Sequence, residues 1–266
     1  MQLAPSEPAS NRLGRIFRDV AERCELPPMP AVAARAAALA SDPEARVEDL
    51  TRVVSTDPAL AARVLRISQS VRYVRRHAPR TLHEAVLAVG FQALRKVLIA
   101  ASCREFYRPD DAVAERLWAH ALTTALAADE LALTAGEERG GESFIAGLLH
   151  DVGRLILHLS HPAAYAQLTR HDEATETALF GVTHAAIGGC LAERWGVERT
   201  IVEAVVFHHN PGASPLAARL ATADGIAHAI GFGSVPGDAG YVHDAALLEI
   251  GARVAEAFEA ERALFA

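Results

Sequence analysis

The residues best suited to chemistry in this sequence are histidines, and most of them lie in its C-terminal half. Ten of the twelve histidines follow residue 118. His150 and Asp151 are adjacent within the apolar stretch 148–154, and Gly153 removes side-chain bulk beside them. An imidazole nitrogen and a carboxylate oxygen that project from one apolar helix suit a divalent metal ion. The pair therefore predicts a metal site.

Two adjacent residues need further ligands to hold an ion. Neighbouring side chains on a helix point about 100° apart, so His150 and Asp151 require partners from other helices. Imidazole and carboxylate ligands from a helical bundle favour Fe, Mn or Zn over Ca or Mg. The alternative is a core without metal, in which the histidines bond to one another and to nearby carbonyl groups. The candidate partners are His120, His184, His208, His209 and Asp224.

The segments that carry these residues are predicted to be helices. Apolar residues recur at the i, i+3, i+4 and i+7 positions along almost the whole chain, and alternating, strand-like stretches are scarce. Asp57 before Pro58, and Thr81 with Glu84, are typical helix starts. We expect an all-α protein, with helices near 11–24, 31–41, 47–55, 58–69, 82–89, 91–106, 111–134, 142–158, 162–170, 173–180, 184–195, 198–209, 214–231 and 240–262.

The best internal boundary is the segment 106–112. Pro109 and the paired acids Asp110 and Asp111 break one helix there and cap the next. This boundary predicts an N-terminal helical part and a C-terminal helical bundle. The expected divisions are an N-terminal segment 1–20, a helical part 21–110, a bundle 111–235 and a C-terminal helix 236–266.

The charge of the chain limits its partners. Lys and Arg number 26 and Asp and Glu 33, for a net charge of −7, so the chain as a whole is not attracted to nucleic acid or to anionic lipid. The basic run 72–80 is the exception, and a solvated loop explains it better than a nucleic-acid contact. Nucleic acid is therefore not an expected partner.

The cysteines and the hydropathy indicate a compartment. Three cysteines at wide spacings form neither a metal-binding pair nor a disulfide framework, which favours a reducing environment. No apolar run reaches the roughly 18 residues that a membrane span requires. We expect a cytoplasmic protein without a membrane partner.

The order of the candidate ligands along the chain resembles that of the HD superfamily of metal-dependent phosphohydrolases. This resemblance implies a core ligand set of His120, His150, Asp151 and Asp224. It matches His184, His208 and His209 to the extra ligands of the HD-GYP branch, whose members hydrolyse cyclic dinucleotides. Two differences separate the chain from that branch, because the segment 210–212 lacks the Gly-Tyr-Pro signature and Arg154 replaces the lysine of the HDxGK motif.

The N-terminal half is similar to a different branch, the HDOD family of HD-related output domains. The matching segments are 26–30, 55–60, 63–68, 82–86 and 89–90, and with those of the C-terminal half they cover roughly residues 20 to 235. The resemblance implies an N-terminal helical subdomain packed on an HD-like bundle. It also implies a bacterial regulatory module that contacts a signalling protein, with a metal or nucleotide in a degenerate HD pocket. The alternative is a metal-dependent phosphohydrolase that uses Asp151 and Arg154 on a nucleotide or cyclic dinucleotide.

Each of two residues near the expected site has two possible roles. Arg154 is suited to bind an anion beside the metal, or to form an ordinary surface ion pair. Glu176 is suited to orient a metal ligand, or to stabilise a helix N-terminus as an acidic residue. Trp118 and Trp195 are expected in the core, because both stand at helical spacing among apolar residues.

Overall fold

The computed structural model describes residues 9–23, 25–40, 42, 44–69, 78–90, 94, 98, 103–108, 110–137, 141–168, 171–235 and 244–264. Every regular element within these ranges is a helix. The prediction of an all-α protein is therefore confirmed.

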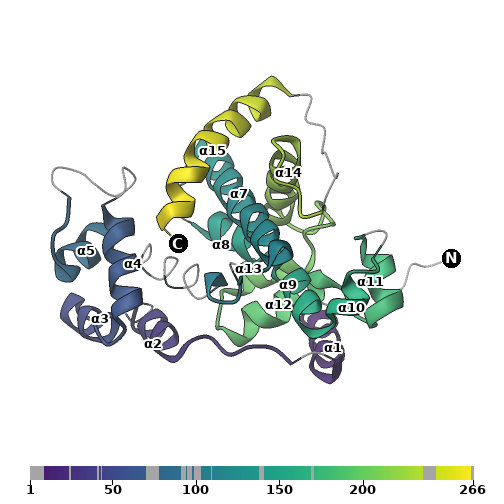
Figure 1. The fold of residues 1–266 in the computed structure, drawn as a ribbon, viewed down its shortest axis with the longest axis horizontal. Helices are drawn as coiled ribbons and strands as arrows, with labels where there is room; N and C mark the ends of the chain where they lie inside the picture. The colour runs from purple at the N-terminus through teal and green to yellow at the C-terminus, as the bar shows by residue number, and fades with distance from the viewer. Residues whose placement is uncertain are drawn as a thin grey trace.

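The long helix α7 (Ala112–Thr134) is the centre of the bundle (Figure 1). Its side chains are buried on nearly every face, as expected for a helix that is surrounded by others. The helices that pack on it are α8 (Glu142–Leu149), α9 (Val152–Ser160), α14 (Pro215–Ala229) and α15 (Ala245–Leu264).

A second set of helices packs around α12 (His184–Arg194). Its neighbours are α13 (Arg199–Val206), α9 and α1 (Ala9–Arg23), so the first helix of the chain lies against the C-terminal half. Arg194 and Trp195 hold the segment that follows α1, because they donate to the backbone carbonyl groups of Leu26 at 3.1 Å and Pro27 at 3.2 Å.

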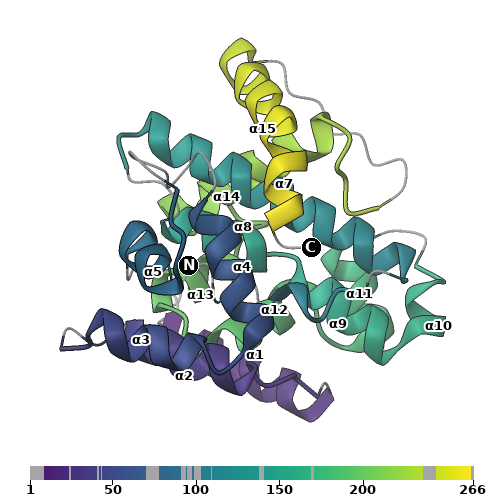
Figure 2. The same ribbon diagram turned by 60° about the vertical axis from the view of Figure 1, so that its left-hand side comes forward.

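The N-terminal helices form a separate lobe, which reaches the bundle where α4 meets α15. Figure 2 shows α2 and α3 at the end of the molecule opposite the start of α15. The lobe comprises α2 (Ala31–Ala40), α3 (Val47–Val54), α4 (Pro58–Ser68) and α5 (Leu82–Val89).

Both helix starts that the sequence predicts in this lobe are confirmed. Asp57 accepts hydrogen bonds from the backbone of Ala59 and Leu60, both at 3.0 Å. Thr81 and Glu84 form the complete capping box at the start of α5. The side chain of Thr81 accepts from the backbone of Glu84 at 3.1 Å, and the carboxylate of Glu84 accepts from the backbone of Thr81 at 3.3 Å.

One predicted helix is wrong in a way that matters for the site. The segment 142–158 forms two helices, α8 and α9, which are separated at His150 and Asp151. Asp151 has φ −106° and ψ 8°, outside the helical region, and its carbonyl accepts from the backbone of Arg154 at 2.9 Å as α9 begins. Apolar periodicity does not reveal the break, because both halves are buried. The predicted ligand pair therefore lies at a helix junction.

One predicted helix is shorter in the structure than the sequence indicates, and parts of other predicted segments lie outside the described residues. The helix expected over 162–170 is reduced to α10 (Pro162–Tyr165), and α11 (Glu173–Phe180) follows it. Residues 72–77 of the basic run, most of the helix expected near 91–106 and the start of the helix expected near 240–262 lie outside the described ranges.

The expected core residues are buried. Trp118 is 1% exposed and Trp195 8% exposed, which confirms their assignment to the core. Among the described residues, no helix combines the length and apolar character needed to cross a membrane.

Asp111 joins the start of α7 to α9. One oxygen of its carboxylate accepts from the backbone of Val113 at 2.9 Å and Ala114 at 3.1 Å, and the other lies 2.7 Å from His158 Nε2. Burial would raise the pKa of Asp111, but the bonds from His158 and from the backbone outweigh this effect. The pKa therefore lies below its usual value of 3.8.

We expect Asp111→Ala to lower the free energy of unfolding by about 1–2 kcal/mol, because α7 loses its N-cap. Since the folded pKa is lowered, the stabilisation is present above pH 3.8 and is lost as the pH falls through the folded pKa. Urea unfolding at several pH values measures both effects. Asp111→Asn is the control, because asparagine caps a helix equally well but does not ionise. An asparagine variant as unstable as the alanine variant would contradict the role of the cap.

Candidate metal centre

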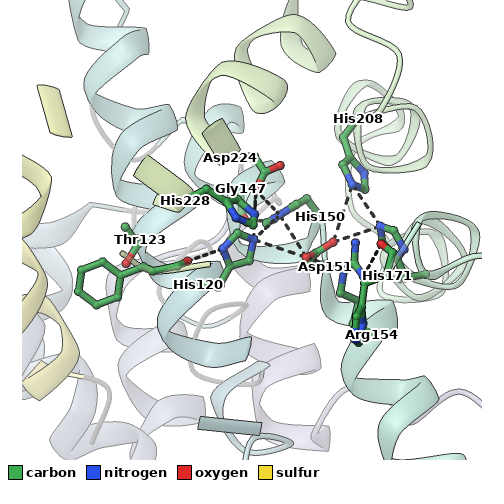
Figure 3. A network of polar contacts seen from close by, with 12 residues as sticks. His120, Thr123, Gly147, His150, Asp151, Arg154, His171, His208, Asp224 and His228 are labelled. Atoms are coloured by element: carbon green, nitrogen blue, oxygen red, sulfur yellow. Dashed lines mark hydrogen bonds and ion pairs between the residues drawn. The ribbon is translucent and has the colours of Figure 1, made fainter. Parts of the chain in front are cut away.

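The structure brings together all seven side chains that the sequence selects as candidate ligands. Figure 3 labels five of them, His120, His150, Asp151, His208 and Asp224. They come from α7, from the α8–α9 junction, from the first residue of α12, from the turn after α13 and from α14. Five are almost completely buried, whereas His209 is exposed and the Asp224 side chain is 26% exposed. The seven are His120, His150, Asp151, His184, His208, His209 and Asp224.

The first group consists of His120, His150, Asp151 and Asp224. His120 Nε2 lies 3.1 Å from His150 Nε2, 3.2 Å from Asp224 Oδ1 and 3.4 Å from Asp151 Oδ2. His150 Nε2 lies 3.7 and 3.9 Å from the same oxygens of Asp151 and Asp224. Ligand atoms that each lie about 2.0–2.2 Å from one ion are about 3 Å apart when they bind at right angles and up to about 4.4 Å apart when they bind on opposite sides. The first group therefore fits a single ion.

The second group consists of His184, His208, His209 and the other oxygen of Asp151. His184 Nε2 lies 3.0 Å from His209 Nε2, 3.3 Å from His208 Nε2 and 3.2 Å from Asp151 Oδ1. His208 Nε2 is 3.8 Å from the same oxygen. These distances fit a second ion.

Asp151 belongs to both groups. Its Oδ2 faces His120 and its Oδ1 faces His184. Oδ1 is buried and accepts no hydrogen bond among the described residues. An unsatisfied buried carboxylate oxygen is costly, and a cation bound there would satisfy it. A carboxylate in this position can bridge two ions.

The four buried histidines are oriented in the same way. Each donates from Nδ1 to an acceptor outside the centre, at 2.6–2.7 Å; the pairs are His120–Phe232, His150–Gly147, His208–Val205 and His184–Glu176. Three of these acceptors are backbone carbonyl groups, which can only accept, so the hydrogen lies on Nδ1. In a neutral ring, Nε2 then carries a lone pair that faces the centre. This is the usual orientation of histidines that ligate metals.

Arg154 and Glu176 lie behind the candidate ligands and hold two of them, Asp151 and His184, by hydrogen bonds. Arg154 is 4% exposed; its Nε donates to Asp151 Oδ2 at 2.8 Å and its Nη1 to Glu176 Oε1 at 3.2 Å. Oε2 of Glu176 accepts from the backbone of His184 at 2.8 Å and from its Nδ1 at 2.6 Å. Arg154 therefore forms an ion pair, but the prediction that this pair lies on the surface is wrong, because Arg154 is buried. Glu176 orients a candidate ligand.

The ionisation of these groups follows from their surroundings. Burial would raise the pKa of Asp151, but the guanidinium of Arg154 and the nearby imidazoles hold it well below its usual range. Burial also lowers the pKa of His184 and His208 well below the ordinary value, so both rings are neutral and able to coordinate. Burial opposes charge on His120 as well, yet its bonds to Asp151 and Asp224 raise its pKa to about 10. A proton on His120 and a metal ion therefore compete for one place.

His228 is a candidate ligand that the sequence analysis missed. Its Nε2 lies 3.2 Å from Asp224 Oδ1, and its ring centroid lies 5.0 Å from that of His120. His228 follows Asp224 by four residues on α14, a spacing that puts two side chains on one face of a helix. That spacing is the signal that identifies it.

Two glycines let the helices that carry the ligands approach closely. A Cβ atom added at Gly153 would lie 2.0 Å from the carbonyl oxygen of His184, and one added at Gly147 would lie 2.6 Å from the Cα of Ala125. Both neighbours are backbone atoms, so the helices themselves would have to move. Gly153 thus sets the distance between α9 and the start of α12.

Comparison with known proteins points to one family. The HDOD domain family matches residues 26–211 of this chain. A protein from Shewanella amazonensis SB2B, provisionally named a phosphohydrolase, has a similar structure, with 25% identity, a TM-score of 0.69 and coverage of 94% of this chain and 95% of that one. An HDOD domain protein of unknown function from Geobacter sulfurreducens has 23% identity, a TM-score of 0.68 and coverage of 96% of both chains.

Two further relatives differ in length from this chain. A protein from Marinobacter aquaeolei VT8, provisionally named a signal transduction protein, has 22% identity and a TM-score of 0.67, with coverage of 96% of this chain and 65% of that one. An uncharacterised protein of Treponema pallidum (strain Nichols) is 26% identical over 210 residues, which are 76% of this chain and 41% of that protein. The chain thus spans about two fifths of the length of the Treponema relative.

We expect Gly153→Ala to push the start of α12 away from α9 and to lower the free energy of unfolding by about 1–3 kcal/mol. Gly14→Ala on α1 is the control, because nothing lies within 4 Å of the added methyl group. The control should be neutral or stabilising by about 0.5–1 kcal/mol, since alanine favours a helix over glycine. Chemical denaturation of both variants measures the difference. If the Gly153→Ala variant were as stable as the wild-type protein, the close approach of α9 to the start of α12 would be contradicted.

Proposed function

Because this chain belongs to the HDOD domain family, we propose that it is a metal-binding regulatory module that acts by contact with a signalling protein. The first and second groups would each hold one divalent ion, Fe, Mn or Zn, as their imidazole and carboxylate atoms favour. His228 would support the first ion through Asp224. A bound ion of this kind polarises water or an anionic ligand.

One observation supports the metal-binding part of this proposal. Four buried imidazoles turn Nε2 toward the carboxylate of Asp151, and backbone carbonyl groups fix three of them in that orientation. Lone pairs and carboxylate oxygens packed this closely repel one another unless a cation lies among them. A core without metal would instead need a proton between the two atoms of each such contact.

The charges around the centre favour regulation over hydrolysis. Enzymes that cleave phosphate esters often hold the ester with arginine or lysine in addition to metal ions. Arg154, the arginine that contacts Asp151 within the buried centre, is already paired with Asp151 and Glu176. Its guanidinium therefore has no free pair of adjacent N–H groups with which to hold a substrate phosphate.

A second candidate function is a metal-dependent phosphohydrolase acting on a nucleotide or cyclic dinucleotide. The observation that favours it is the position of Asp151, whose two oxygens face the two groups as in enzymes that use a pair of ions. The name given to the Shewanella relative agrees with this candidate. In that case Asp151 would hold both ions, and Arg154 would keep Asp151 charged.

We expect the wild-type protein to retain up to two divalent ions after removal of excess metal, measured by elemental analysis. His150→Ala should remove the ion of the first group and His209→Ala that of the second. Asp151→Asn should weaken both, since its oxygens face both groups.

His83→Ala is the matched control, because His83 is an exposed histidine on α5, away from the centre. It should retain the wild-type metal content. Circular dichroism shows whether each variant is folded. A folded wild-type protein without metal, or equal loss in the control, would contradict the proposed centre.

The two candidate functions differ in turnover. We expect the protein loaded with Mn²⁺, Fe²⁺ or Zn²⁺ to show a higher melting temperature than the chelated protein, since a ligand that binds only the folded state stabilises it. We expect no hydrolysis of bis(p-nitrophenyl) phosphate or of cyclic dinucleotides above the rate of free metal. Metal-dependent turnover that Asp151→Asn abolishes and His83→Ala retains would establish the phosphohydrolase instead.

A further inference from the structure

A cavity of about 360 Å³ lies beside the exposed edge of the second group. His209 and Asn210 line it on the side of the metal centre, and α1, α11 and the turn before α12 complete the wall. Its volume is in the range of sites for small molecules. The cavity is distinct from the buried ligands, and His209 is the member of the second group that lines it.

The lining of this cavity combines an apolar surface with a few polar groups, and the carboxylate of Glu173 is one of them. Ile16, Val182 and Phe207 provide apolar contact from three separate elements. Thr177 and Asn210 provide hydrogen-bonding groups at its edge. The Thr177 hydroxyl donates to the carbonyl of Glu173 at 2.7 Å, which leaves its oxygen able to accept. Such a lining suits a small ligand with an apolar body.

Arg23 does not line the cavity itself, but it places a positive charge against Gly181, which does. Gly181, which lines the cavity, ends α11 with φ +76°, and a Cβ atom added there would lie 2.9 Å from Arg23 Nη1 and 3.0 Å from its Cζ. The guanidinium therefore packs directly on the glycine. Arg23 is exposed, and among the described residues no carboxylate or carbonyl accepts a hydrogen bond from it. This cation is available to a ligand.

We infer that the cavity binds a small molecule that carries a phosphate, phosphonate or carboxylate group on an apolar body. The ion of the second group and Arg23 attract the anionic group, and the surface around Phe207 contacts the body. The inference rests on the proposed function, because it requires the ion at His209. It gives the regulatory module a ligand that is bound and not cleaved.

Phenylphosphonate is a suitable probe, because its phosphorus–carbon bond resists hydrolysis and its ring supplies an apolar body. We expect it to bind the Mn²⁺-loaded protein saturably, with paramagnetic broadening of its phosphorus resonance. Methylphosphonate should bind about tenfold more weakly, because it lacks the ring. Benzoate, followed by its proton resonances, shows whether a carboxylate is accepted in place of the phosphonate.

Two variants test the cavity without changing the candidate ligands. Arg23→Gln should weaken phenylphosphonate about tenfold or more, whereas Arg18→Gln, an exposed arginine on the same helix, should have no effect. Thr177→Trp, at the exposed edge of α11, should fill the cavity and abolish binding without loss of metal.

The outcomes separate this inference from the proposed function. A protein that retains its ions but does not bind phenylphosphonate overturns the inference alone. Binding that survives both Arg23→Gln and Thr177→Trp also overturns it, because the probe then lies elsewhere. A folded protein without an ion at His209 overturns both the inference and the proposed function.

Discussion

A carboxylate buried among imidazoles requires compensating positive charge, and Asp151 imposes this requirement on the rest of the fold. Arg154 supplies one full charge, but a buried guanidinium needs a second anion of its own. Glu176 is that anion, and its remaining oxygen accepts from His184. A single buried charge thus determines the placement of groups from α9, α11 and α12. The imidazoles add lone pairs but no charge unless a proton or an ion lies among them.

The backbone is shaped to meet the same requirement. The chain leaves the helical conformation at Asp151, so that its two oxygens face different groups of ligands. Gly153 then allows the start of α12 to approach within contact of α9, which places His184 beside Asp151. The first backbone N–H of α12 donates to Glu176 instead of remaining unsatisfied, as helix N-termini otherwise do. The break, the glycine and the helix start therefore serve one arrangement.

The sequence predicts the class of the fold and the members of the candidate site more completely than their geometry. Helical periodicity and capping residues such as Thr81 are local signals, and the structure confirms them. The break at Asp151 escapes the same reasoning, because it changes one backbone conformation without altering the apolar pattern on either side. Arg154 illustrates a second limit. Its pairing with Glu176 joins α9 to α11 across 22 positions of sequence, a separation that no local spacing signals. His228 is different, since its spacing from Asp224 is a local signal that can be recognised.

The distribution of the candidate ligands bears on how such a module would work. They come from α7, the α8–α9 junction, α12, the turn after α13 and α14, so an ion bound there would link most of the bundle. The free energy of binding such an ion is also free energy of folding, because the unfolded chain does not hold the ligands together. The bundle contacts the N-terminal lobe where α15, packed on α7, meets α4. Occupancy of the centre would therefore change the stability of the same helices that support the lobe. That coupling suits a protein that presents or withholds a surface for a partner, and it needs no chemical step.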